Sequence, residues 1–475
     1  MAAVEQKTVH ETVLSSWAND VLPSLSGLVG IPALSPAFDS DWAQTGQLKA
    51  AIEHVRGWLE ARSLPGATVE VVELEGRTPV LLLDVPATPG AEDKGTVLLY
   101  GHLDKQPPVG GWSEGLDPWK PVLKDGRLYG RGAADDGYAG YAATTALEAI
   151  HAAGGAHARA VVILETGEES GSPDLPAYLE HLTDKLGRVS FVVCLDSGGN
   201  DYERIWLTTS LRGMVQVHVT VRVLDSSQHS GLASGIVPSS FRILRTLLDR
   251  IENSESGELL LAELNVEIPE NRLTETRASA DVAPGAVKKT FPLVEGAHAV
   301  TEDNYELLLN NSWRPTLSVI GASGLPEPAD AGNVLRDSTT LALSFRLPPT
   351  ADSAAALAVV EKALTTDVPY GAKVELAGLE NADGWNAPES APWLATALEG
   401  VSDQIFGAPW RAVGLGGSIP FMALLGLKYP EAQFLVTGAL GTDSNIHVPD
   451  EWLHLDQAQR ITESVAHILD AHARG

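Results

Sequence analysis

The chain has 475 residues, 44% of them hydrophobic and 20% charged, which suits two or three globular domains and excludes a disordered or collagenous protein. The formal net charge of −29 repels phosphate backbones and anionic lipid, so we expect neither nucleic acid nor a membrane as partner. The single cysteine, Cys194, excludes an internal disulfide, and residues 1–13 lack the apolar segment of a signal peptide. These features together predict a cytoplasmic protein.

Apolar spacing predicts an α/β arrangement in the first part of the chain. Leu48, Ile52 and Val55 recur at steps of three and four, which indicates a helix that ends near Pro65. An Ala-rich helix is predicted at 138–153, where two glycines end it. Short apolar runs predict buried strands at 80–85, 96–100, 160–164, 191–195 and 433–437. Strands that alternate with helices favour a mixed, mainly parallel sheet that is covered on both faces.

A different pattern begins at about residue 208. Five valines between 215 and 223 alternate with polar residues, which is typical of a strand with one buried face. Further elements are predicted as a helix at 238–251, a strand around 341–345, a helix at 354–363 and a strand around 374–376. Two β-α-β units indicate a ferredoxin-like α+β insert. We therefore expect a domain split into 1–207 and 386–475, with an inserted domain at 208–385, of which 252–305 allows no prediction.

Metal-binding residue types follow the predicted strands directly. In an open α/β sheet, the residues just beyond the carboxyl ends of the strands form the binding site. Carboxylates gathered there would repel one another unless a cation neutralised them. Imidazole mixed with carboxylate suits zinc, with manganese or cobalt as alternatives, and a carboxylate shared by two ions suits a two-metal hydrolytic site. The residues in these positions are His102, Asp104, Glu165, Glu168, Glu169, Asp196 and His447, with the pair Asp135-Asp136 before the Ala-rich helix.

Seven short segments resemble a known family in their order and spacing. They are GHLD (101–104), GRGAADD (130–136), GEESGS (167–172), LDSGG (195–199), HSG (229–231), GGSIP (416–420) and SNIHVPDE (444–451). The set resembles the metallopeptidase family of carnosinase, aminoacylase and glutamate carboxypeptidase, and is most similar to the carnosinase-type dipeptidases. The resemblance implies a zinc-exopeptidase-like catalytic domain of the α/β class, with the insert as a lid and dimerisation domain.

The resemblance also implies a role for each matching residue at the metal centre. Two divalent ions, zinc by preference, would share the carboxylate of Asp135. By the same likeness, His102 and Asp196 would hold one ion, and Glu169 and His447 the other. Asp104 would fix the tautomer of His102. Glu168 would be the general base that takes a proton from a water between the two ions and passes it to the leaving amine.

Four further residues match positions that contact the substrate in the family. His229 resembles a histidine that reaches into the neighbouring subunit and stabilises the oxyanion, which implies a homodimer. Asn333, Arg346 and Ser418 resemble substrate-binding positions, and the guanidinium fork of Arg346 suits a substrate carboxylate. Ser418 would add a hydrogen bond to the same carboxylate.

The predicted activity is hydrolysis of the amide bond of dipeptides or short peptides. An N-acyl-amino-acid deacylase or a carboxypeptidase of the same family is the alternative, since either would use the same metals and base. A catalytically silent binding protein on this fold is the alternative from another class. A serine hydrolase is disfavoured, because the one G-x-S-x-G match, at 111–115, lies in a proline-flanked loop and not at a strand-to-helix turn.

Overall fold

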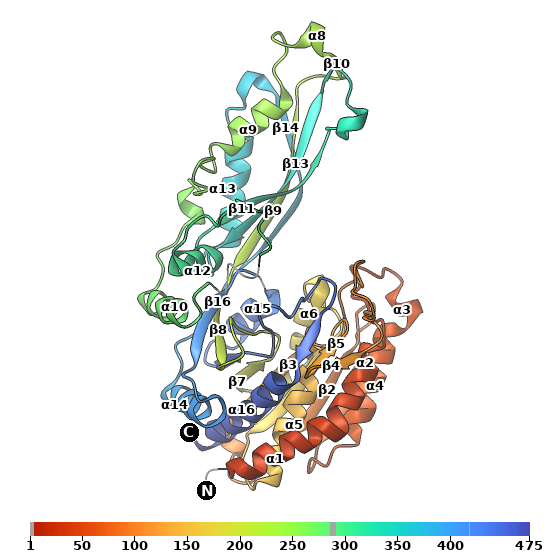
Figure 1. The fold of residues 1–475 in the computed structure, drawn as a ribbon, viewed down its shortest axis with the longest axis vertical. Helices are drawn as coiled ribbons and strands as arrows, with labels where there is room; N and C mark the ends of the chain where they lie inside the picture. Colours follow the sequence, from red (N-terminus) through yellow and green to blue (C-terminus); the bar gives the residue numbers. More distant parts are fainter. Residues whose placement is uncertain (1–3, 286–290, 418) are drawn as a thin grey trace.

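The computed structural model describes residues 4–285, 291–417 and 419–475. A broad lower part of the molecule is built on a six-stranded sheet, and an elongated upper part rises from it (Figure 1). In spatial order the six strands are β1 (Thr68–Val72), β2 (Val80–Val85), β6 (Arg159–Glu165), β3 (Thr96–His102), β7 (Val189–Cys194) and β17 (Gln433–Val436). The last four are mutually parallel, whereas β1 and β2 are antiparallel to their neighbours. The five strands predicted here are found within two residues at each end.

Helices cover both faces of this sheet, which explains the unbroken apolar runs of its strands. On β3, Val97 and Leu99 pack into one hydrophobic core, and Leu98 and Tyr100 pack into the other. The first core contains residues of α1 (Gln6–Ser16), α2 (Leu22–Val29), α4 (Gln47–Glu60), α5 (Ala139–Ala152), α14 (Pro392–Val401) and α16 (Leu455–Arg474). The second contains residues of α6 (Leu175–His181), α7 (Thr183–Leu186) and α15 (Pro420–Lys428).

The upper part contains a four-stranded antiparallel sheet. Its strands, in spatial order, are β11 (Thr316–Ser323), β13 (Ser338–Leu347), β9 (Gly213–Arg222) and β14 (Lys373–Ala382). The apolar faces of β9 and β13 form a core with α9 (Ser240–Leu248) and α13 (Ser353–Thr365), in a ferredoxin-like order of elements. Strand β11 was not predicted, because it lies at the sheet edge with Val319 and Ile320 exposed and so lacks an alternating apolar pattern.

The segment that allowed no prediction, 252–305, contributes one helix and the start of a second at the junction of the two parts. They are α10 (Glu270–Val282) and α12 (Asn304–Ser312), and both pack against β16 (Arg411–Leu415). This strand belongs to a small sheet with β8 (Trp206–Leu211) and β15 (Trp385–Asn386). Strand β8 runs across the predicted boundary at 207/208. The division into 1–207, 208–385 and 386–475 stays a prediction.

Short elements complete the fold. At the tip of the upper part lie β10 (Gln228–His229) and α8 (Ser230–Ala233) (Figure 1), and β10 pairs with β12 (Val334–Leu335). A second small sheet contains β4 (Val122–Lys124), β5 (Arg127–Tyr129) and β18 (Trp452–His454). Across the three described ranges, the structure contains no helix both long enough and apolar enough to cross a membrane.

Candidate metal centre

The predicted ligand residues gather at the carboxyl edge of the six-stranded sheet. His102 ends β3, and Asp196 follows β7. Glu168 and Glu169 form the 3-10 turn η3 (Glu168–Ser170) directly after β6. His447 lies in the loop between β17 and β18. Because β3, β6, β7 and β17 run in parallel, their carboxyl ends meet at one edge. Asp135 joins them from the loop before α5.

The side chains of these residues approach one another closely. Nε2 of His102 lies 3.4 Å from Oδ1 of Asp135, 3.8 Å from Oδ2 of Asp196 and 4.0 Å from Oε2 of Glu168. Nε2 of His447 lies 2.9 Å from Oδ2 of Asp135. The two carboxylate oxygens of Asp135 therefore face two different imidazoles, as a carboxylate shared between two ions would require.

Two sets of three residues have ligand atoms that all lie within 4.8 Å of one another. One set is His102, Glu168 and Asp196, and the other is His102, Asp135 and Glu169. His447 lies beside the second set, with Nε2 3.3 Å from Oε2 of Glu169. Glu168, the predicted base, thus has a carboxylate oxygen within 4.8 Å of the ligand atoms of His102 and Asp196, close enough to share an ion with them.

The hydrogen bonding of His102 tests whether these residues fit a metal ion. Its Nδ1 is 3.1 Å from the main-chain carbonyl oxygen of Asp104, which can only accept, so Nδ1 carries the proton. In the neutral ring, Nε2 then presents a lone pair to the carboxylates. This atom is buried and has no hydrogen-bond partner among the described residues. A buried lone pair that faces several carboxylates fits a cation between them.

Asp104 lies beside His102, as the predicted contact requires, and also supports the turn that carries the two glutamates. Its carboxylate oxygen Oδ1 lies 3.5 Å from Nδ1 of His102, and Nδ1 donates to the main-chain carbonyl of Asp104 at 3.1 Å. The two carboxylate oxygens accept the backbone N–H groups of Glu168, at 3.1 Å, and Glu169, at 3.0 Å. Asp104 therefore fixes the turn that carries both glutamates.

The charges at the centre also favour a bound cation. Burial is the largest cause that raises the pKa values of Glu168, Glu169 and Asp196 above the ordinary carboxyl range, and neighbouring carboxylates raise them further. Asp135 differs: burial alone would raise its pKa, but the imidazoles of His102 and His447, which are protonated when no cation is bound, lower it. Without a cation the carboxylates of this cluster destabilise one another's charged forms.

Three polar residues near the centre were missed or left without a role by the sequence. Both carboxylate oxygens of Asp136 are buried and have no hydrogen-bond partner among the described residues. Nε2 of Gln106 donates to Oε2 of Glu169 at 2.6 Å. Glu165 accepts hydrogen bonds from the hydroxyls of Tyr100 and Ser172 at 2.5 and 2.8 Å, and burial raises its pKa to about 7. The sequence around Asp136, Gln106 and Glu165 contains no pattern that would have predicted these contacts.

The predicted substrate-binding residues are only partly placed near the centre. Ser418 lies outside the described residues. Arg346 lies near the C-terminal end of β13, and its positive charge acts on the nearby guanidinium of Arg212. Burial, and then the charge of Arg346, lower the pKa of Arg212 to about 10. Arg212 also donates from Nε to the carbonyl of Gly416, at 3.0 Å, and from its backbone N–H to that of Gly417, at 3.2 Å. Arg212 therefore contacts the loop that leads to Ser418, and Arg346 lies near Arg212.

His229 lies on β10, and Asn333 directly precedes β12, which pairs with β10; Figure 1 shows β10 at the tip of the upper part, far from β3. They are neighbours there, because the backbone N–H of Ser230 donates to the carbonyl of Asn333 at 2.8 Å. Both residues are exposed. Within one chain, therefore, neither residue approaches the metal-binding cluster.

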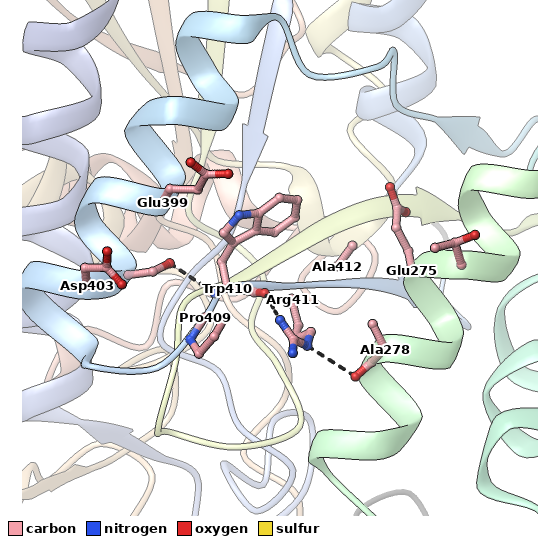
Figure 2. Close-up of a pocket in the computed structure, with 10 residues that line it drawn as sticks. Glu275, Ala278, Glu399, Asp403, Pro409, Trp410, Arg411 and Ala412 are labelled. Atoms are coloured by element: carbon pink, nitrogen blue, oxygen red, sulfur yellow. Dashed lines mark hydrogen bonds between the residues drawn. The ribbon is translucent and has the colours of Figure 1, made fainter.

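A separate cavity of about 460 Å³ lies between α10, β16 and the π-helical segment η7 (Ser402–Phe406). Trp410 lies on its wall with Glu399 and Asp403 nearby (Figure 2). The guanidinium of Arg411 donates hydrogen bonds to the carbonyls of Ala278, at 3.2 Å, and Trp410, at 2.8 Å. None of the described predicted site residues lines this cavity, so it is distinct from the metal-binding cluster.

The covered α/β sheet and the imidazole–carboxylate cluster at its edge define a metal-dependent hydrolase. Residues 98–471 match the family model described as Peptidase family M20/M25/M40, and the chain belongs to this family. The predicted family, and with it the enzyme class of metallopeptidase, is therefore confirmed.

Comparisons with individual proteins agree with this assignment. The chain is 28% identical over 384 residues to "Cysteinylglycine-S-conjugate dipeptidase" of Corynebacterium striatum, covering 79% of this chain and 81% of that protein. It is 30% identical over 274 residues to human "Beta-Ala-His dipeptidase", covering 57% and 53% of the two chains. The structure of human carnosine dipeptidase 1 is similar with a TM-score of 0.75 at 23% identity, over 99% of this chain and 100% of that one.

The fold is shared with a carboxypeptidase as well. A family M20 metallo-carboxypeptidase from Sulfolobus solfataricus is similar with a TM-score of 0.78 at 18% identity, over 96% of this chain and 100% of that one. The predicted fold class, an α/β domain with a mixed, mainly parallel sheet and an antiparallel insert, is thereby confirmed.

Proposed function

We propose that this protein is a metal-dependent dipeptidase that hydrolyses the amide bond of dipeptides with a free carboxylate. The observation that carries the proposal is Asp135, whose two carboxylate oxygens face the imidazoles of His102 and His447 beside Glu168. The names of the curated relatives, a cysteinylglycine-S-conjugate dipeptidase and a β-Ala-His dipeptidase, support the substrate class.

The proposed ligand sets follow the two sides of Asp135. His102 and Asp196 would hold one divalent ion, and Glu169 and His447 the other, with Asp135 shared. Zinc is the expected ion, with manganese and cobalt as alternatives, because the donors are imidazole and carboxylate. Bound ions of this kind polarise a carbonyl and lower the pKa of water.

Glu168 is the proposed general base. It lies at the edge of the cluster, with Oε2 4.0 Å from Nε2 of His102, on a turn whose backbone Asp104 holds. Burial raises its pKa, and neighbouring carboxylates add to the rise, which suits a group that takes a proton from water and returns it to the leaving amine.

Arg346 is proposed to bind the free carboxylate of the substrate, together with Ser418. A guanidinium binds a carboxylate in a bidentate manner, and a second guanidinium nearby, that of Arg212, strengthens the attraction for an anion. Arg212 additionally holds the loop that leads to Ser418 through the carbonyls of Gly416 and Gly417.

The positions of Asn333 and Arg346 support a homodimer. Asn333 precedes β12 at the tip of the insert, whereas Arg346 lies at the opposite end of the ten-residue strand β13. A strand of that length spans about 30 Å, so the two side chains can contact one dipeptide only if they come from different chains. His229 lies beside Asn333 and would arrive with it. The tip is also apolar where a partner would cover it, with Leu232 77% and Ile236 82% exposed.

A substrate screen tests the proposed activity. Purified protein loaded with Zn²⁺ or Mn²⁺ should hydrolyse free dipeptides, and the same dipeptides with an amidated C-terminus should be poor substrates because they lack the carboxylate. N-acyl amino acids and longer peptides complete the panel, with kcat/KM as the measurement. A higher kcat/KM for N-acyl amino acids would identify a deacylase instead, and release of single C-terminal residues from longer peptides would identify a carboxypeptidase.

Subunit mixing tests the donated histidine. An inactive His229→Ala chain and an inactive Glu168→Gln chain, exchanged into mixed dimers, form one site that has both an intact base and an intact histidine. Activity should therefore reappear in the mixture. The His229→Ala parent should be nearly inactive by itself, because loss of one oxyanion donor costs about 10² to 10³ in turnover. The matched control replaces His218, an exposed histidine on β9 of the same insert, and His218→Ala should be active by itself. If demonstrated heterodimers remain inactive, His229 does not act in the neighbouring site.

A further inference from the structure

Glu451 has a fully buried carboxylate four residues beyond His447. Its Oε1 accepts the backbone N–H groups of Gly132, Ala134 and Asp135 at 3.0, 3.2 and 3.3 Å. Its backbone carbonyl accepts the N–H of Gly130 at 3.0 Å. The residue therefore binds the backbone that presents Asp135 through several hydrogen bonds.

Arg131 completes this arrangement from the other side. Its Nη1 donates to Oε2 of Glu451 at 2.7 Å, and both side chains are buried. Its Nη2 donates to the carbonyl of Val448, the residue after His447, at 3.0 Å. One guanidinium thus connects the buried carboxylate to the loop that carries His447, so the Arg131–Glu451 pair joins the two loops that meet at the metal centre.

The loop that carries His447 needs such support. Asn445, His447 and Asp450 have φ angles of 56°, 64° and 64°, in the left-handed region. Residues with a Cβ rarely adopt this conformation, and it persists where surrounding contacts hold it. The side chain of His447 is also 50% exposed, so packing does little to hold it. Contacts at the end of the loop must therefore contribute to the position of its imidazole.

We propose that Glu451 is a positioning residue for the metal centre, whose carboxylate sets the position of Asp135 relative to His447. The inference rests on the proposed function, because it takes these two residues as metal ligands. The negative charge is essential to it. A carboxylate only accepts, as all four donors require, whereas the NH₂ group of a glutamine would face either the backbone N–H groups or the guanidinium.

The test compares Glu451→Gln with Glu463→Gln. Glu463 is a second buried glutamate, on α16 and paired with His10 of α1, so its replacement also removes a buried carboxylate but leaves both loops intact. Zn²⁺ is titrated into each metal-stripped protein against a chelating dye, and the melting temperature of each is measured without metal. Loss of an outer partner of a metal site typically weakens affinity about 10- to 100-fold. We expect that loss for Glu451→Gln and no change in affinity for Glu463→Gln.

Activation by Mn²⁺ provides a second readout. For Glu451→Gln, the half-activating Mn²⁺ concentration should rise by about 10- to 100-fold, while excess Mn²⁺ restores most of the turnover. If Glu451→Gln does not fold, Arg131→Lys replaces it, because a lysine keeps the charge but loses the second arm that reaches Val448. Its Zn²⁺ affinity should fall in the same direction.

The outcomes separate a positioning role from a structural one. A lower melting temperature with unchanged Zn²⁺ affinity would show that Glu451 only stabilises the fold, and would overturn the proposal. An equal loss of affinity in Glu463→Gln would overturn it too, because the effect would then not be specific to the two loops. Failure of the unmodified chain to bind Zn²⁺ or Mn²⁺ would instead contradict the proposed function itself, and with it this role.

Discussion

Treatment with a chelator is expected to abolish amide hydrolysis. The candidate ligands include no group that could replace a divalent ion in polarising the scissile carbonyl, so the stripped protein should lack measurable turnover. Metal analysis of the purified protein should give up to two ions per chain, and Zn²⁺, Mn²⁺ or Co²⁺ should restore activity. The stripped chain should also melt at a lower temperature, because Glu169, Asp135 and Asp196 then repel one another.

The control for this experiment is the same chelator saturated with Zn²⁺ before it is added, so that it cannot remove ions from the protein. Activity should then survive, which excludes an effect of the chelator on the protein itself. Full activity in a preparation shown by metal analysis to contain no divalent ion would contradict metal dependence.

Replacement of Glu168 by glutamine should lower turnover by about 10² to 10⁴ while metal content stays nearly unchanged, because the amide cannot carry the proton. Glu169→Gln should lose metal instead, because a neutral amide is a weaker ligand. The two residues are a matched pair: they adjoin each other in one turn, and Asp104 holds both backbone N–H groups. Turnover and metal content of both variants are measured on the same preparations.

This pair of variants also decides a point that the distances leave open. Glu168 lies within ligand distance of His102 and Asp196, so it has the geometry to bind an ion directly. In that case both variants would lose metal to the same extent, and the assignment of Glu168 as base and Glu169 as ligand would be wrong.

Much of the fold follows from local patterns in the sequence. The strands β2, β3, β6, β7 and β17 were predicted because each is a short apolar run, and a strand covered on both faces must be apolar throughout. The alternation in β9 and β13 identified the insert, because each strand has one face on a core and one turned outward. Such patterns depend on the burial of each residue and are therefore visible without long-range information.

Two of the elements that escaped prediction, β11 and α10, have few buried residues of their own. Strand β11 is held mainly by its backbone pairing with β13, and its exposed residues carry no period. Helix α10 packs on β16, which lies more than a hundred residues away in sequence, and few of its residues are buried. Their positions depend on partners that a local pattern cannot identify.

For the candidate site, the sequence by itself determined which donor types follow which strands, because parallel strands bring their carboxyl ends to one edge. Tertiary structure decided the contacts among them. It placed Asp135 between His102 and His447, and gave the Nδ1 hydrogen bond of His102 to a main-chain carbonyl. It also buried Glu451 behind the loop of Asp135, 316 residues away in sequence. Such contacts arise only when distant segments pack together, since neither chain spacing nor residue type specifies which side chains then meet.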